Sequence, residues 1–93
     1  MQNYKWLLMV VADNGRYEKT LELPFVPQIG MTIFRSGSQE MWSGCGASSD
    51  VYYEAPPITA FGWNIDEERF EVEIAINRKV KLDSTFWDEF IPL

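Results

Sequence analysis

The chain has 93 residues, of which 15% are aromatic, and it carries a formal net charge of −6 at pH 7. It contains no histidine and a single cysteine, Cys45. These counts exclude Ser-His-Asp and Cys-His catalytic arrangements, a zinc site made of four nitrogen and sulfur ligands, and an internal disulfide.

The N-terminal part of the chain predicts a β-hairpin. Residues 4–12 are apolar on both faces, which is typical of a central strand that is covered on both sides. Residues 17–23 alternate between apolar and polar side chains, as in a half-buried strand. The sequence Asp13-Asn14-Gly15-Arg16 between them favours a turn, so we expect the two strands to pair antiparallel.

Residues 21–34 contain prolines and a glycine that are expected to interrupt the strands. The rest of the chain is expected to be arranged around this segment. Pro24 and Pro27 end a sheet ladder because they lack an N–H, and Gly30 allows the chain to turn back sharply into the sheet. A short strand over residues 31–35 is expected to follow. Three apolar side chains are expected to fold back as a lid on the core: Phe25, Val26 and Ile29.

Residues 36–49 are rich in glycine and serine and are expected to form a flexible loop. Short strands over residues 40–42 and 51–54 are two further interpretations of this region. Cys45 lies between two glycines without a basic neighbour in the sequence that would activate its thiol, so we expect it to have no catalytic role.

The C-terminal half predicts a second hairpin and a terminal helical turn. Residues 58–65 are expected to form a strand in which Gly62 marks a bulge or a close backbone approach. Residues 70–76 alternate, with apolar side chains inward and glutamates outward. After a short strand over residues 79–82, capping residues predict a helical turn over residues 83–90, whose aromatic side chains would plug one end of a barrel.

Together these elements predict a mostly β fold, either a small antiparallel barrel or a strongly bent sheet of five to seven short strands, with a short C-terminal helical turn. The length suits a single compact domain over residues 1–93. The order of strands beyond the two hairpins stays open between SH3-like and OB-like arrangements. The sequence has neither an apolar run of membrane-spanning length nor a signal-peptide pattern, and with its lone cysteine it is expected to be cytoplasmic.

Negative charge is concentrated in the middle of the chain, where residues 36–76 carry eight acidic side chains and one basic side chain, Arg69. This charge disfavours nucleic acid and favours a basic protein partner; the alternative interpretation is that it serves solubility alone. Large aromatic residues and methionine are favoured as interface anchors, and Trp42 is expected either to anchor a partner or to cap the core. The expected partner-binding residues are Met41, Trp42, Tyr52, Tyr53, Glu54, Asp66, Glu67, Glu68, Glu71 and Glu73.

The sequence therefore predicts a small, non-enzymatic binding protein that occludes a basic protein partner and needs no cofactor or metal. In size and charge it resembles compact inhibitors such as bacterial immunity proteins and phage-encoded anti-defence proteins, a resemblance that transfers no residue. One alternative is a structural or assembly domain that homo-oligomerises through a strand edge or through residues 24–29. Another is an enzyme that uses carboxylates alone, which would need a deep pocket lined by paired acidic residues.

Overall fold

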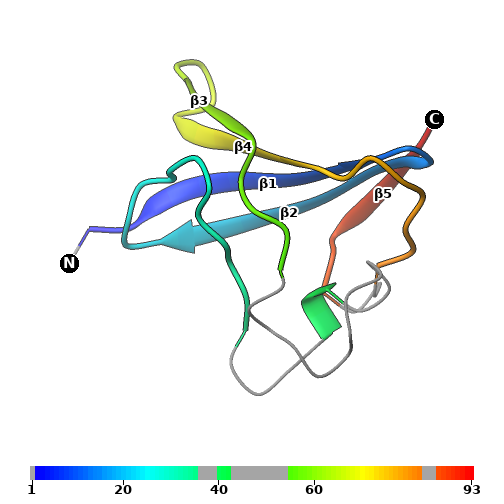
Figure 1. Cartoon of the computed structure of the whole chain (residues 1–93). Coiled ribbons are helices and arrows are strands. Elements are labelled where there is room, and N and C mark those ends of the chain that lie inside the picture. Colours follow the sequence, from blue (N-terminus) through cyan, green and yellow to red (C-terminus); the bar gives the residue numbers. More distant parts are fainter. Residues whose placement is uncertain (1, 36–39, 43–54, 83–85) are drawn as a thin grey trace.

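Five strands form one mixed sheet in the order β3-β4-β1-β2-β5 (Figure 1). The computed structural model describes residues 2–35, 40–42, 55–82 and 86–93. β1 pairs parallel with β4, and the other neighbouring strands pair antiparallel. The prediction of a mostly β fold is thus confirmed. The elements are β1 (Tyr4–Ala12), β2 (Gly15–Leu23), the 3₁₀ turn η1 (Glu40–Trp42), β3 (Ala60–Asn64), β4 (Arg69–Ala75) and β5 (Glu89–Pro92).

Both predicted hairpins are present. β1 and β2 pair from Tyr4 opposite Leu23 to Ala12 opposite Gly15, and β3 and β4 pair from Ala60 to Asn64. β1 lies at the centre of the sheet, as its apolar sequence predicted, because β2 and β4 bond to its two sides.

The core lies on one face of this sheet. Trp6, Leu8 and Val10 of β1 are fully buried there, and so are Val72 and Ile74 of β4. In the view of Figure 1 the connecting segments lie mostly below the sheet. They supply much of the remaining core: Met41, Ile58, Val80, Leu82, Phe86 and Trp87.

The opposite face of β1 is less covered than the sequence predicted. Leu7, Met9 and Val11 point to that face and are only half-buried. Their neighbours across the ladders include Glu71 and Glu73 of β4, which are compatible with a face in contact with water. The central strand is therefore covered on one face rather than on both.

The sheet is not closed into a barrel. Closure requires the two edge strands to meet, and β3 and β5 each pair with one neighbour only within the described residues. The strand order explains the difference, because β4 pairs with the side of β1 opposite β2 and so places the second hairpin there. The sheet therefore extends in both directions instead of curling on itself.

Residues 89–92 form β5 rather than the end of a helical turn. They pair antiparallel with β2, which gives backbone partners to an edge that would otherwise be bare. Gly15 makes this approach possible, because a Cβ atom there would lie 2.5 Å from the carbonyl oxygen of Ile91. Asp88 fixes the start of β5 by accepting a hydrogen bond of 3.1 Å from the backbone N–H of Thr20.

Three of the shorter predicted strands are not strands. Residues 40–42 form η1, while residues 31–35 and 79–82 follow irregular paths. Side chains from the first hairpin hold the last of these segments in place of a ladder. The Asn14 side chain binds both backbone polar groups of Val80, and the Tyr17 hydroxyl accepts a hydrogen bond of 3.1 Å from the backbone N–H of Leu82. The expected strand over residues 51–54 lies outside the described residues, as does the expected loop over residues 36–49 apart from η1.

The expected lid over the core is present only in part, because the half-exposed Phe25 ring packs edge-on against the buried Trp6 at a centroid distance of 5.5 Å. Phe25, Val26 and Ile29 are exposed, whereas Pro27 is buried in their place. Trp6 explains part of this arrangement, since its indole N–H donates a 3.3 Å hydrogen bond to the Phe25 carbonyl and thereby holds that segment by its backbone.

Candidate partner-binding surface

The β3–β4 hairpin carries exposed apolar side chains at the edge of the sheet. Phe61, Trp63 and Ile65, which we call the edge row, are 42%, 50% and 80% exposed. Phe61 and Trp63 lie opposite Val72 and Phe70 of β4, so they belong to the core face of the sheet. The connecting segments that cover the rest of that face do not cover them.

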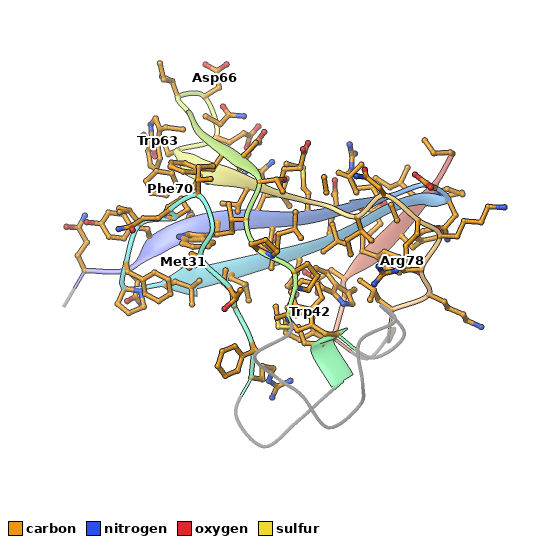
Figure 2. All side chains as sticks on the ribbon, in the orientation of Figure 1. Met31, Trp42, Trp63, Asp66, Phe70 and Arg78 are labelled. Atoms are coloured by element: carbon orange, nitrogen blue, oxygen red, sulfur yellow. The ribbon has the colours of Figure 1, made fainter. Side chains whose placement is uncertain are left out.

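Trp63 is held in position although half of its surface is exposed. Its ring packs edge-on against Phe70 at a centroid distance of 4.9 Å (Figure 2). Phe70 in turn packs against Tyr4 at 6.0 Å. A hollow of about 440 Å³ lies beside this group, with Tyr4, Trp63, Ile65 and Glu68 among its lining residues. A large side chain held in this way loses little conformational freedom when a partner covers it.

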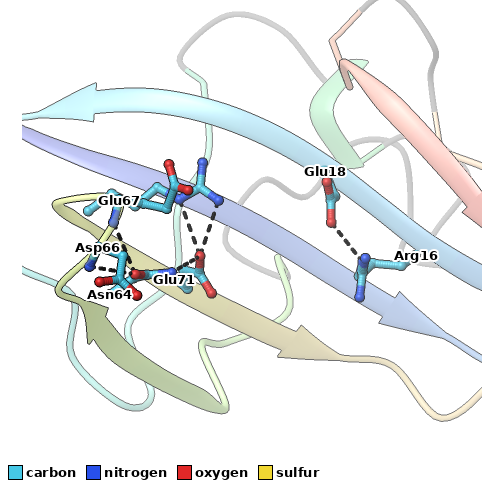
Figure 3. Close-up of polar contacts among 7 residues, drawn as sticks. Arg16, Glu18, Asn64, Asp66, Glu67 and Glu71 are labelled. Carbon is cyan, nitrogen blue, oxygen red and sulfur yellow. Dashed lines mark hydrogen bonds and ion pairs between the residues drawn. The ribbon is translucent and has the colours of Figure 1, made fainter.

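The turn between β3 and β4 is acidic and exposed. The Asn64 side-chain oxygen accepts hydrogen bonds from the backbone N–H groups of Asp66 at 3.0 Å and Glu67 at 3.1 Å (Figure 3). Glu68 completes the turn with φ of 54°, which is uncommon for a residue other than glycine. Asn64 rather than the carboxylates thus shapes the turn, and all three acidic residues are exposed to solvent.

Glu71 and Glu73 lie on the outer face of β4, opposite Gly62 and Ala60 of β3. The Glu71 carboxylate accepts hydrogen bonds from the Asn64 amide at 3.0 Å and from the Arg69 guanidinium at 3.1 and 3.2 Å (Figure 3). The Asn64 bond, together with the bond and charge of Arg69, lowers the pKa of Glu71 against the opposing effect of partial burial. Glu73 forms no side-chain ion pair within the described part of the chain.

The hairpin therefore brings together five of the predicted site residues and separates them from two others. Met41 is 1% exposed and belongs to the core, so it offers no surface to a partner in this arrangement. Trp42 is half-buried against the core, where its indole N–H donates to the Ile33 carbonyl and its ring lies 5.6 Å from that of Trp87. These contacts favour the interpretation of Trp42 as a cap on the core.

Figure 2 shows Trp42 well away from Trp63 and Asp66. Three further predicted site residues lie outside the described residues: Tyr52, Tyr53 and Glu54.

The edge row is not among the site residues predicted from the sequence. A usable signal was the alternation of Phe61 and Trp63 with the small residues Ala60 and Gly62, since glycine weakens a central strand and is better tolerated at an edge. The expected bulge at Gly62 does not form, because Gly62 pairs in regular register with Glu71.

In the part of the chain that the structure describes, no charged residue is buried, no group of three or more histidine, cysteine, aspartate or glutamate side chains is placed to hold a metal ion, and no helix is long and apolar enough to cross a membrane. Comparisons with protein-family models, curated proteins and solved structures find no match for this chain.

Proposed function

We propose that this protein is a non-enzymatic binding module that recognises a basic protein partner through its β3–β4 hairpin. The observation that carries the proposal is the position of Trp63, a half-exposed but firmly packed tryptophan beside a turn of three exposed carboxylates. Tryptophan is among the residues most enriched in binding hot spots, where its truncation typically costs about 2 kcal/mol or more.

The two parts of this surface have different tasks. The acidic turn steers a basic partner and raises the association rate, an effect that salt screens over about 10 Å. The edge row supplies the apolar surface whose burial slows dissociation. Acidity that served solubility alone would not require exposed aromatic side chains beside it.

The properties of Glu71 favour recognition over catalysis. A general acid needs a raised pKa near the working pH, whereas Asn64 and Arg69 lower the pKa of Glu71. The absence of histidine from the sequence removes the residue most often used for proton transfer. We therefore assign the protein an occluding rather than a chemical role.

Affinity capture from the source cells, followed by mass spectrometry, tests the proposal. The wild type and the Trp63→Ala variant serve as baits, and Phe34→Ala, which truncates a 48% exposed aromatic side chain outside the hairpin, is the matched control. We expect a basic protein to be retained by the wild type and the control, and to bind Trp63→Ala at least about tenfold more weakly. Capture that is indifferent to Trp63, or a captured partner that is acidic, contradicts the proposal.

Self-association through the sheet edge is a second candidate, and one observation favours it. β3 is an edge strand in which every residue is uncharged, and its two aromatic side chains are exposed. Strands of this kind readily pair with copies of themselves. Light scattering separates the candidates, because a stable dimer favours assembly and a monomer favours the binding module.

A further inference from the structure

From the edge of the sheet we infer the form in which the partner binds: an extended segment, alternating apolar residues with lysine or arginine, adds to β3 as a sixth strand. This inference rests on the proposed function and specifies how the basic partner is recognised. It follows from the backbone of β3, from the small residues on one face of that strand, and from the apolar residues on its other face.

The two edges of the sheet differ in how they are protected. Natural edge strands are blunted by charges, prolines or bulges. β5 contains Glu89 and Pro92, whereas β3 contains no charged residue, no proline and no interruption of its register with β4. The structure places no other strand on the outer side of β3 within the described residues. Its outward N–H and C=O groups are therefore suited to pair with an incoming strand.

On the outer face of β3, a side chain of an added strand can reach Glu71 and Glu73 of β4. A strand added to β3 would lie about 10 Å from β4, because neighbouring strands are about 4.8 Å apart. β3 places small residues opposite both carboxylates, Ala60 at Glu73 and Gly62 at Glu71, although Asn64 and Arg69 already bond the Glu71 carboxylate. A Cβ atom added at Gly62 would meet nothing within 4 Å, so this space is open. A long basic side chain can extend across residues this small to a carboxylate.

The core face of β3 presents the opposite chemistry. Phe61 and Trp63 lie on that face and are half-exposed. Side chains of the incoming strand that point to this face would contact them as cross-strand pairs. Since successive side chains of a strand point to opposite faces, the preferred ligand alternates apolar residues with basic ones.

Charge favours a basic strand over a second copy of this chain as the segment that pairs with β3. A second β3 would supply no basic residue to Glu71 and Glu73 and would bring a second net charge of −6 close by. A basic strand supplies a counter-charge to Glu73, which forms no ion pair within the described residues, and adds a second one to Glu71 beside Arg69.

Titration calorimetry with short synthetic peptides tests the inference on the intact protein. The probe alternates lysine and valine, and the first control has the same composition with the lysines grouped at one end. Two further peptides keep the alternating sequence but carry N-methyl groups on one or the other alternate set of backbone nitrogens. We expect the grouped peptide to bind about tenfold more weakly than the probe, because its lysines no longer alternate with valines. We expect one of the two methylated peptides to bind about tenfold more weakly as well, because its ladder hydrogen bonds are lost.

A matched pair of protein variants locates the site. Ala60→Lys places a positive charge at the β3 edge in front of Glu73, whereas Thr20→Lys adds the same charge on the same face of β2. We expect about tenfold weaker binding of the probe for Ala60→Lys and less than about twofold for Thr20→Lys. Circular dichroism checks that both variants fold.

Equal binding of all four peptides would overturn strand addition and leave recognition of basic charge intact. Failure of both unmethylated peptides to bind would overturn the inference, while the proposed function would fall only if the capture experiment yielded no Trp63-dependent basic partner. A wild type that dimerises and loses the dimer on Ala60→Lys, without binding the probe, would identify a second copy as the occupant and overturn the inference as well.

Discussion

Two aromatic groups on the core face of the sheet have similar ring geometry and opposite environments. In the closed group, Phe86 packs edge-on against Trp87 at 5.1 Å, and in the open group Trp63 packs edge-on against Phe70 at 4.9 Å. Trp87 is nevertheless 5% exposed and Trp63 50%. Ring contacts alone therefore do not distinguish a core residue from a surface residue.

The difference in exposure depends on whether connecting segments hydrogen-bond to the polar atoms of the aromatic side chains. The Trp87 indole N–H donates a 2.9 Å hydrogen bond to the Met41 carbonyl, and the Tyr17 hydroxyl bonds the backbone of Val80 and Leu82. These acceptors and donors belong to connecting segments that cross the closed group. The β3–β4 connection is a short turn and cannot fold back over its own strands, so the open group stays uncovered.

The most direct test of the difference between the closed and open groups is to truncate one tryptophan from each. We expect Trp87→Ala to lower the free energy of unfolding by about 3–5 kcal/mol, because it leaves a cavity and an unpaired Met41 carbonyl. Trp63→Ala should cost less than about 1 kcal/mol, since half of that side chain is already exposed. Urea unfolding measures both values, and similar losses for the two variants would show that the open group is part of the stabilising core.

A second pair of substitutions tests where the backbone approaches closely. Gly15→Ala places a Cβ atom against the Ile91 carbonyl and the Phe90 ring, at a φ of 154°, so we expect it to displace β5 and to cost about 1–3 kcal/mol. Gly62→Ala meets nothing within 4 Å and should change stability by less than about 0.5 kcal/mol. Thermal unfolding compares the variants. Equal effects at the two positions would mean that β5 does not depend on the space at Gly15.

The sequence predicted the two hairpins well because local alternation and turn residues specify them. It did not predict that β1 and β4 pair in parallel, since no local pattern records which strands meet after a long connection. That pairing decides that the sheet stays open and that β3 becomes an edge. The helical turn expected over residues 83–90 is not confirmed, and residues 83–85 lie outside the described part of the chain. Residues 89–92 form β5 because the free edge of β2 offers partners that a local capping pattern does not reveal.

The site was predicted in part. A count of charges was enough to single out the acidic residues of the β3–β4 hairpin, because charged side chains lie at the surface in almost any fold. Aromatic residues are different, since burial is their usual fate and exposure depends on the neighbouring segments. The sequence therefore favoured Trp42, which caps the core, over Trp63, whose exposure follows from the strand order.

The smallest expected effect on stability comes from two carboxylates, Asp88 next to Trp87 of the closed group and Glu71 next to Phe70 of the open group. Asp88 accepts a hydrogen bond from the Thr20 backbone and pairs with Lys19 at 3.1 Å; these contacts lower the pKa of Asp88, as those of Asn64 and Arg69 lower the pKa of Glu71. A lowered pKa in the folded state stabilises the fold above the ordinary values of 3.8 and 4.5, and this contribution is lost as the pH falls through the folded-state pKa.

We therefore expect Asp88→Asn and Glu71→Gln each to cost less than about 1 kcal/mol at pH 7, and their deficits relative to the wild type to shrink by about pH 3. Urea unfolding at the two pH values measures this. If hydrogen exchange is followed as well, Asp88→Asn should increase exchange in β5 and Glu71→Gln should increase it in the β3–β4 hairpin, because each carboxylate holds only its own region. A deficit that stays constant with pH would show that the hydrogen-bonding shape of the side chain, rather than its charge, holds that region.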